Sequence, residues 1–190
     1  MLKYEDAPDN VKIVYDDIFE HLGNEGLVDY FKVLGNYNCV VLEVTWNALK
    51  HILIKGELPR SLKELVFVAV SNEKSCDYCT DIHTALCKLL NVDEGDIQKV
   101  LSKATDLNPQ RVKLSIEFAK KMAISPDTIS ADDHNVLLDA GLTQSQIFEL
   151  MGLVSLVNYS NTLAQGMMID VDDNIVSMLN TLLIRINSHH

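Results

Sequence analysis

The sequence predicts an all-α fold, and three observations lead to this prediction. Apolar residues recur at helical spacing along almost the whole chain, and no convincing run of alternating apolar and polar residues is present. The 190 residues include only four Pro and eight Gly, which argues against a turn-rich β fold. Apolar residues make up 47% and charged residues 23%, a globular composition for a chain long enough to bury one sizeable core.

In the first part of the chain, the apolar periodicity predicts helices that end at glycines or prolines. Gly23 and Gly56 are plausible stops, and Pro59 separates one helix from the next. We expect residues 1–45 to form a helical extension that packs on a helical domain of residues 46–190. The helices expected before Pro59 cover about residues 2–22, 27–34 and 40–55.

Beyond Pro59, capping patterns mark the helix starts. Ser61 to Glu64 and Thr143 to Gln146 both read as capping boxes, and Gly141 is a natural left-handed stop. Pro109 is well placed as a first helical residue. The helices expected here cover about residues 61–72, 76–90, 93–104, 109–125, 130–140, 143–163 and 174–186.

The charge balance excludes two classes of partner. Lys and Arg number 16 and Asp and Glu number 27, so the net charge is -11 with His neutral. Such a chain repels phosphate backbones and anionic lipid, so we expect neither nucleic-acid nor membrane-surface binding. No segment approaches the roughly 18 apolar residues of a spanning helix, and the N-terminus lacks the pattern of a signal peptide. We therefore expect a cytoplasmic protein with reduced thiols.

One predicted helix concentrates the reactive side chains. Cys76, Cys79 and His83 fall at positions i, i+3 and i+7, which places all three on one face. Both cysteines lie in the first turn, where the positive end of the helix dipole lowers a thiol pKa. His83 follows Cys79 by one turn, roughly 6 Å along the axis, so it can exchange a proton with a thiol directly or through one water.

This geometry suits the reduction of peroxides by two thiols. One thiolate attacks the O–O bond and becomes a sulfenic acid, and the neighbouring thiol condenses with it to a disulfide. An external dithiol then restores the reduced pair. Two other roles for the cysteine pair stay open, namely a zinc site and a purely structural pair of small buried side chains. A zinc site needs four ligands, and no second CxxC or HxxxH follows, so we expect no bound metal.

The other cysteines and Glu64 complete the set of candidates. Cys39 and Cys87 resemble core cysteines. If the helices on either side of residues 74–75 form an antiparallel hairpin, Glu64 faces about position 86, within a turn of His83. A carboxylate there would orient the imidazole and raise its basicity. Alternatively, Glu64 only completes the capping box on Ser61.

The combination resembles the active-site signature of the alkylhydroperoxidase D-like proteins, within the carboxymuconolactone decarboxylase superfamily. Glu64, eleven intervening residues and Cys76-x-x-Cys79-x-x-x-His83 carry the resemblance. The flanks at residues 56–59 and 130–150 are similar to the peroxidase-related branch, and the resemblance covers about residues 46–168.

The resemblance implies an all-α protein that assembles as trimers or hexamers and reduces hydroperoxides in antioxidant defence. It implies that Cys79 attacks, that Cys76 is its disulfide partner, and that His83 and Glu64 relay protons. The helix-end argument instead favours Cys76 as the more acidic thiol. No bound cofactor is expected, and the electron donor is an external dithiol, for which a lipoyl carrier is one candidate. Tyr78 stands where the best-known members have a second His, so it is a candidate auxiliary residue but a poor base at neutral pH.

Two other functions remain in competition with the peroxidase. One is a thiol–disulfide oxidoreductase that acts on protein partners. The other is a non-catalytic helical assembly with a redox-responsive cysteine pair. Kinetics with peroxides and with protein disulfides separate these alternatives.

Overall fold

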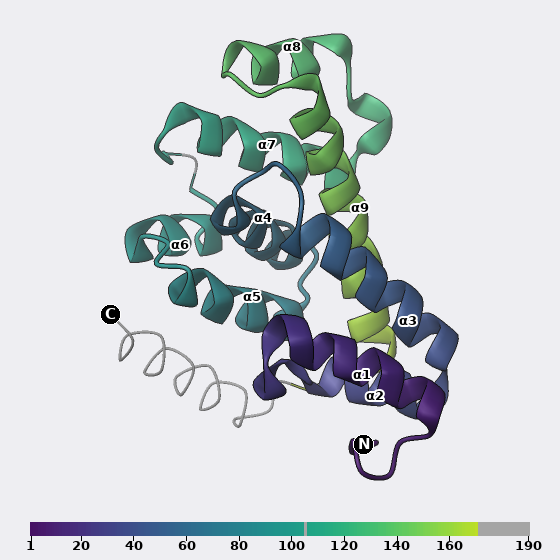
Figure 1. Cartoon of the computed structure of the whole chain (residues 1–190). Helices are drawn as coiled ribbons and strands as arrows, with labels where there is room; N and C mark the ends of the chain where they lie inside the picture. The colour runs from purple at the N-terminus through teal and green to yellow at the C-terminus, as the bar shows by residue number, and fades with distance from the viewer. Residues whose placement is uncertain (105, 171–190) are drawn as a thin grey trace.

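The computed structural model describes residues 1–104 and 106–170, and within these ranges it contains helices and no strand (Figure 1). This confirms the all-α prediction. The helix expected over residues 174–186 lies outside the described residues. The described α-helices are α1 (Asp9–Leu22), α2 (Asp29–Tyr37), α3 (Cys39–Ala48), α4 (Arg60–Glu73), α5 (Asp77–Leu89), α6 (Glu94–Leu101), α7 (Gln110–Ile124), α8 (Ala131–Asp139) and α9 (Gln144–Gly166).

Helix α4 lies at the centre of the molecule. Figure 1 shows α5, α6, α7 and α9 grouped around it, and each of these helices contacts α4. Every residue of α4 from Leu62 to Ser71 is buried, including the charged Lys63 and Glu64. A helix that is apolar on nearly all sides must be enclosed by other helices, which explains its place in the core. The charged groups on this helix are therefore held by specific partners.

The N-terminal helices pack on this core through α3. Helix α3 continues into a π-helical segment (Leu49–Ile54) that contacts α4 and α9. Trp46 is 2% exposed, and its indole N–H donates to Asp17 of α1. Lys50 pairs with the same carboxylate. The buried apolar residues of α1 and α2 thus join the same hydrophobic cluster as those of α4 and α9.

Two of the predicted helix starts have the expected capping geometry, and one does not. The reciprocal bonds of a capping box join Thr143 to Gln146 at the start of α9. Another capping box joins Ser130 to Asp133 at the start of α8. The capping box predicted for Ser61 and Glu64 is wrong, because α4 already begins at Arg60 after Pro59. Glu64 is therefore free to turn its carboxylate into the interior.

The loop before α4 is held by a buried ion pair. Lys63 is 1% exposed, and its ammonium group pairs with Glu149 of α9 and donates to the carbonyls of Ile52 and Lys55. Glu149 also accepts the backbone N–H groups of Glu57, at 2.7 Å, and Leu58, at 3.1 Å.

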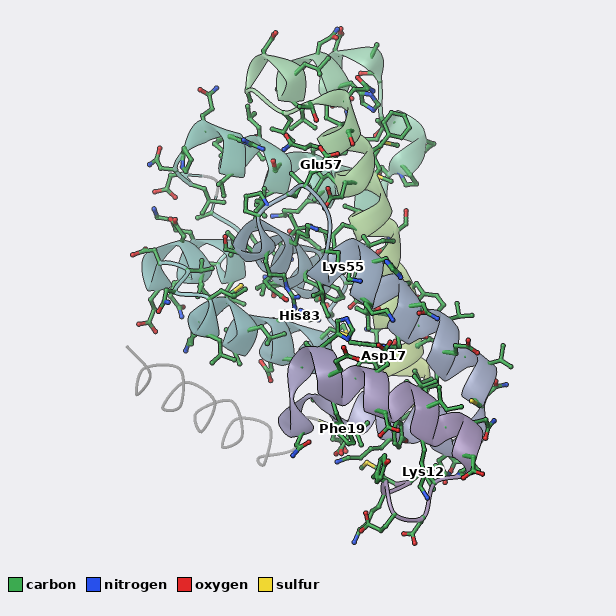
Figure 2. The ribbon with its side chains drawn as sticks, viewed as in Figure 1. Lys12, Asp17, Phe19, Lys55, Glu57 and His83 are labelled. Atoms are coloured by element: carbon green, nitrogen blue, oxygen red, sulfur yellow. The ribbon has the colours of Figure 1, made fainter. Side chains whose placement is uncertain are left out.

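Gly56 makes this closure sterically feasible. Its φ of +106° favours glycine, and a Cβ there would lie 2.2 Å from a Glu149 carboxylate oxygen. The contact between the loop and α9 fixes the start of α4 and hence the position of Glu64. Lys55 and Glu57 are labelled on this loop in Figure 2.

No helix within residues 1–104 and 106–170 combines the length and apolarity that a membrane crossing requires.

Candidate active site

The cysteine pair lies at the beginning of α5. Cys76 occupies the position just before the helix, and Cys79 is its third residue. Both thiols are free, and the two residues are 2% and 4% exposed. The short turn between α4 and α5 contains Ser75 with a positive φ of 54°, and Gln165 of α9 donates to the carbonyls of Lys74 and Ser75. The turn that presents Cys76 is therefore held in place by α9.

The two thiols form a coupled pair of unequal acidity. A hydrogen bond from the Cys79 thiol, aided by the Cys79 backbone N–H, lowers the pKa of Cys76 against the effect of burial. The same hydrogen bond, together with burial, raises the pKa of Cys79. Cys76, with a pKa lowered to about 7, is therefore the more acidic thiol of the pair, and its sulfur lies at the positive end of the helix dipole.

A buried carboxylate orients the imidazole. Glu64 is completely buried, and its Oε2 lies 2.5 Å from His83 Nδ1. Arg60 Nε donates to the other carboxylate oxygen at 2.6 Å. Burial alone would raise the pKa of Glu64, but the charges and hydrogen bonds of His83 and Arg60 outweigh it and hold this pKa below its ordinary value. Glu64 is therefore an anion that fixes the orientation of the imidazole.

His83 is also held from the side. Its ring stacks on Phe67 of α4, with centroids 3.5 Å apart and planes inclined by 14°. Figure 2 shows His83 in the interior, between α4 and α5 and the end of α1. Nδ1 faces Glu64, so Nε2 is the ring nitrogen that remains for proton exchange with a reacting group.

An apolar cavity of about 140 Å³ adjoins Cys79 and His83. Its wall combines side chains of the N-terminal helices with residues of α4, α5 and α9, and includes Phe31, Trp46 and Phe67. Cys76 does not line this cavity and instead lies in a separate hollow with Asp77 and Gln165. Cys79 and Cys76 therefore border two different hollows at the beginning of α5.

Tyr78 also lines the cavity, but its hydroxyl is engaged by α2. It is 6% exposed, and its hydroxyl accepts the backbone N–H of Tyr30 at 3.2 Å. Burial raises the pKa of Tyr78, so its hydroxyl is not a base at neutral pH. The described contacts make Tyr78 a link between α5 and α2.

The described residues offer little support for a metal at the cysteines. The one group of three close metal-ligating side chains in the described part of the chain is Asp17, Glu20 and His21, and it does not include a cysteine. The Asp17 carboxylate is already engaged by Trp46 and Lys50. Within residues 1–104 and 106–170, no such group brings the further ligands of a four-ligand zinc site to the cysteine pair.

Arg60, near the site, was not predicted from the sequence, whereas the buried Cys87 was expected. Arg60 precedes Glu64 by one helical turn, a spacing that predicts an i,i+4 ion pair once Glu64 is known to face inward. Cys87 follows His83 by one turn and is fully buried. Burial, with the nearby Glu64 charge, raises its pKa. This agrees with its expected role as an inert core cysteine, whereas Cys39 is only partly buried.

The fold and the site define an all-helical protein with a buried dithiol, an imidazole and a carboxylate beside an apolar cavity. The profile of the carboxymuconolactone decarboxylase family matches residues 41–108, the segment that contains all four groups. Over this segment the chain is similar to the carboxymuconolactone decarboxylase family, and it shares the fold of the AhpD-like structures described next. This confirms the resemblance noted in the sequence.

Solved structures with the same fold include three useful comparisons. The alkylhydroperoxidase AhpD core of an uncharacterised peroxidase-related protein from Ralstonia eutropha JMP134 has a TM-score of 0.81 at 18% identity, and 93% of each chain is covered. An uncharacterised peroxidase-related protein from Silicibacter sp. TM1040 has a TM-score of 0.78 at 20% identity, with 90% of each chain covered.

The third comparison is the debrominase Bmp8, with a TM-score of 0.76, 16% identity and 95% of each chain covered. A cysteine-to-alanine variant of Bmp8 is known in complex with 2,3,4-tribromopyrrole. No curated protein sequence matches this chain. At these identities the likenesses establish the fold, and they show that it occurs in proteins with different activities.

Proposed function

We propose that this protein is a thiol-dependent peroxidase that reduces organic hydroperoxides in antioxidant defence. The observation that carries the proposal is that Cys79 and His83 line the same apolar cavity, while Cys76 lies next to Cys79 on the other side of the helix start. This arrangement provides an attacking thiol, a proton donor and a second thiol in one place.

Cys79 is the attacking thiol in this proposal because it, and not Cys76, faces the cavity. The proton shared by the two sulfurs moves to Cys76, which leaves Cys79 as the thiolate. Its sulfur attacks the terminal oxygen of ROOH, the O–O bond breaks, and Cys79 becomes a sulfenic acid. The departing alkoxide takes a proton from protonated His83, which the Glu64 carboxylate stabilises, and leaves as ROH.

The cycle closes through Cys76. The Cys76 thiol gives up the proton that it received, its sulfur attacks the sulfenic sulfur and a disulfide forms, and the departing hydroxide takes that proton and leaves as water. An external dithiol, for which a lipoyl carrier is one candidate, then reduces the disulfide and becomes a disulfide itself. The sum is one hydroperoxide and one dithiol converted to an alcohol, a water and one disulfide. The assembly into trimers or hexamers stays a prediction.

Thiol counting tests this proposal. The reduced protein is treated with one equivalent of tert-butyl hydroperoxide, and free thiols are counted in the wild type, Cys76→Ser and Cys79→Ser. We expect the wild type to lose two of its four thiols. Dimedone should trap a sulfenic acid in Cys76→Ser and not in Cys79→Ser. Cys39→Ser is the matched control and should still lose two thiols.

The alternatives give different outcomes. A trapped sulfenate only in Cys79→Ser would make Cys76 the attacker, in line with its greater acidity. Reaction with protein disulfides but not with peroxides would favour a thiol–disulfide oxidoreductase, although both sulfurs are buried. A reversible disulfide without turnover would indicate a redox-responsive assembly. Unchanged thiols under excess peroxide would reject the peroxidase, and turnover of 2,3,4-tribromopyrrole instead would indicate dehalogenation.

A further inference from the structure

Two buried hydroxyl groups in the apolar cavity lack a hydrogen-bond partner among the described residues. They are Tyr30 Oη of α2 and Ser160 Oγ of α9, on residues that are 5% and 4% exposed. Both residues line the cavity together with Cys79 and His83. A buried hydroxyl without a partner destabilises the folded protein, so two of them in one cavity point to a ligand that satisfies them.

The Tyr30 hydroxyl cannot easily turn elsewhere. Its ring stacks with Tyr78 at a centroid distance of 6.4 Å and an interplanar angle of 24°, and it meets Phe31 edge-on at 5.7 Å. The Tyr30 backbone is anchored to the Tyr78 hydroxyl. Burial, chiefly, raises the pKa of Tyr30, and the nearby Cys79 sulfur adds to the rise; the neighbouring Ser160 hydroxyl opposes it, although the two hydroxyls do not meet in hydrogen-bond geometry. The hydroxyl therefore remains a proton donor throughout the ordinary pH range, close to the sulfur that faces the cavity.

The rest of the cavity favours a small apolar body. Besides the aromatic residues, the wall includes Leu22, Val28, Leu53 and Ile82. Its volume of about 140 Å³ is comparable to the engineered cavity of about 150 Å³ that binds benzene. Apolar surroundings exclude water from the two hydroxyls, and this strengthens any hydrogen bond that they make with a ligand.

We infer that the cavity binds a small aromatic or branched aliphatic compound with one oxygen function, and that Tyr30 and Ser160 hydrogen-bond to that oxygen beside Cys79. The inference rests on the proposed function only where it names the natural ligand, an organic hydroperoxide whose alkyl-bound oxygen is held by the hydroxyl pair. The two residues are positioning residues that select organic hydroperoxides over hydrogen peroxide, which has no apolar body.

Binding of unreactive ligands tests this inference without any turnover. Benzyl alcohol and toluene differ by one hydroxyl, and both match the benzene-sized cavity. Trp46 is the only Trp of the chain and lines the cavity, so its fluorescence reports occupancy. We expect wild-type protein to bind benzyl alcohol about 5- to 10-fold more tightly than toluene, as one net buried hydrogen bond provides. Tyr30→Phe should bring the two affinities within about twofold of each other, and Ser160→Ala should reduce the ratio in part.

Matched controls separate a local effect from a general loss of structure. Tyr15→Phe removes a buried hydroxyl that does not line the cavity and bonds to the Phe31 carbonyl, so it should keep the wild-type ratio. Toluene affinity should stay within about twofold in every variant, since no apolar wall is changed. A cooperative melting transition shows that each variant is folded. If Tyr30→Phe does not fold, the test depends on Ser160→Ala.

Two results would overturn the inference. One is that the wild type binds benzyl alcohol and toluene equally tightly. The other is that the ratio of these two affinities is unchanged in both Tyr30→Phe and Ser160→Ala. Failure of the proposed function looks different. If no peroxide is reduced while the alcohol preference depends on Tyr30, the binding site stands and the peroxidase does not. If peroxides are reduced and the preference is absent, only the positioning role is lost.

Discussion

Glu64 Oε2 lies 2.5 Å from His83 Nδ1, and this contact joins the central helix α4 to the helix that carries both thiols. The carboxylate is fully buried, while the side chain of His83 is 10% exposed toward the cavity. Among the described residues, His83 and Arg60 form ion pairs with the Glu64 carboxylate. We therefore expect a substitution of Glu64 to affect the reaction through the His83 imidazole.

Replacing Glu64 with Gln should lower activity through His83. Gln keeps the size of the side chain but removes the charge that stabilises the protonated imidazole. In the proposed reaction, kcat/KM for tert-butyl hydroperoxide should fall on the order of 100-fold, as expected when a general acid is impaired. Glu73→Gln, on the same helix but paired with Lys103 and Lys120, should stay within about twofold. An equal loss in both variants would point to damage of α4 instead.

Replacing Cys79 should change the acidity of Cys76. The Cys79 thiol is the main cause of the lowered Cys76 pKa. Cys79→Ala removes this donor and should move the Cys76 pKa toward its ordinary value of 9.0, whereas Cys79→Ser retains a hydroxyl donor and should keep part of the shift. Thiolate absorbance at 240 nm, titrated from pH 5 to 10, measures both, with the Cys76→Ser variant as the reference. Identical titrations of Cys79→Ala and Cys79→Ser would show that the helix end, not the hydrogen bond, controls the acidity.

The sequence could predict the parts of the site that depend on local spacing. Cys79 and His83 lie one turn apart on α5 and line the same cavity, as the helical repeat predicts, whereas Cys76 lies just before the helix and borders a different hollow. The hairpin argument also placed Glu64 near His83, and the structure brings the two together. The capping box on Ser61 failed because Pro59 is the N-cap and the helix begins at Arg60, two residues earlier than the pattern indicates. The catalytic roles of Cys76, Cys79, His83 and Glu64 remain proposals.

Tyr30, Ser160 and Phe67 could not be predicted in this way. The hydroxyl of Tyr30 reaches the cavity through the packing of α2 against α5, and Ser160 reaches it from α9. Neither residue has a spacing relation to Cys79 that a local pattern reveals. The cavity arises where helices from distant parts of the chain meet, and tertiary packing alone decides which of their polar side chains face it.

Replacing Lys63 should destabilise the protein strongly. Lys63→Met leaves Glu149 buried without its cation, and it removes the link from the loop carbonyls of Ile52 and Lys55 to α4. Loss of one partner from a buried ion pair typically costs about 3–5 kcal/mol in the free energy of unfolding. Urea unfolding followed by circular dichroism measures the change. Lys113→Met breaks only an exposed pair with Glu117 and should cost less than about 0.5 kcal/mol. If Lys63→Met also lowered the free energy of unfolding by less than about 0.5 kcal/mol, water would have taken the place of the Lys63 ammonium group beside Glu149.

The salt bridge at the start of α8 should contribute to stability only above a defined pH. Contacts with Lys121, chiefly, and with Ser130 lower the pKa of Asp133 from 3.8 to about 2. Because the folded pKa is depressed, this contribution is complete above the unfolded pKa of 3.8 and is lost as the pH falls toward 2. Asp133→Asn should therefore melt at a lower temperature than the wild type at pH 5 to 7, and the gap in Tm should shrink steadily between pH 4 and pH 2.5. Asp132→Asn removes the neighbouring carboxylate, which has no ion pair within the described residues, and should show no such dependence. A gap for Asp133→Asn that stays constant with pH would assign the loss to capping geometry rather than to charge.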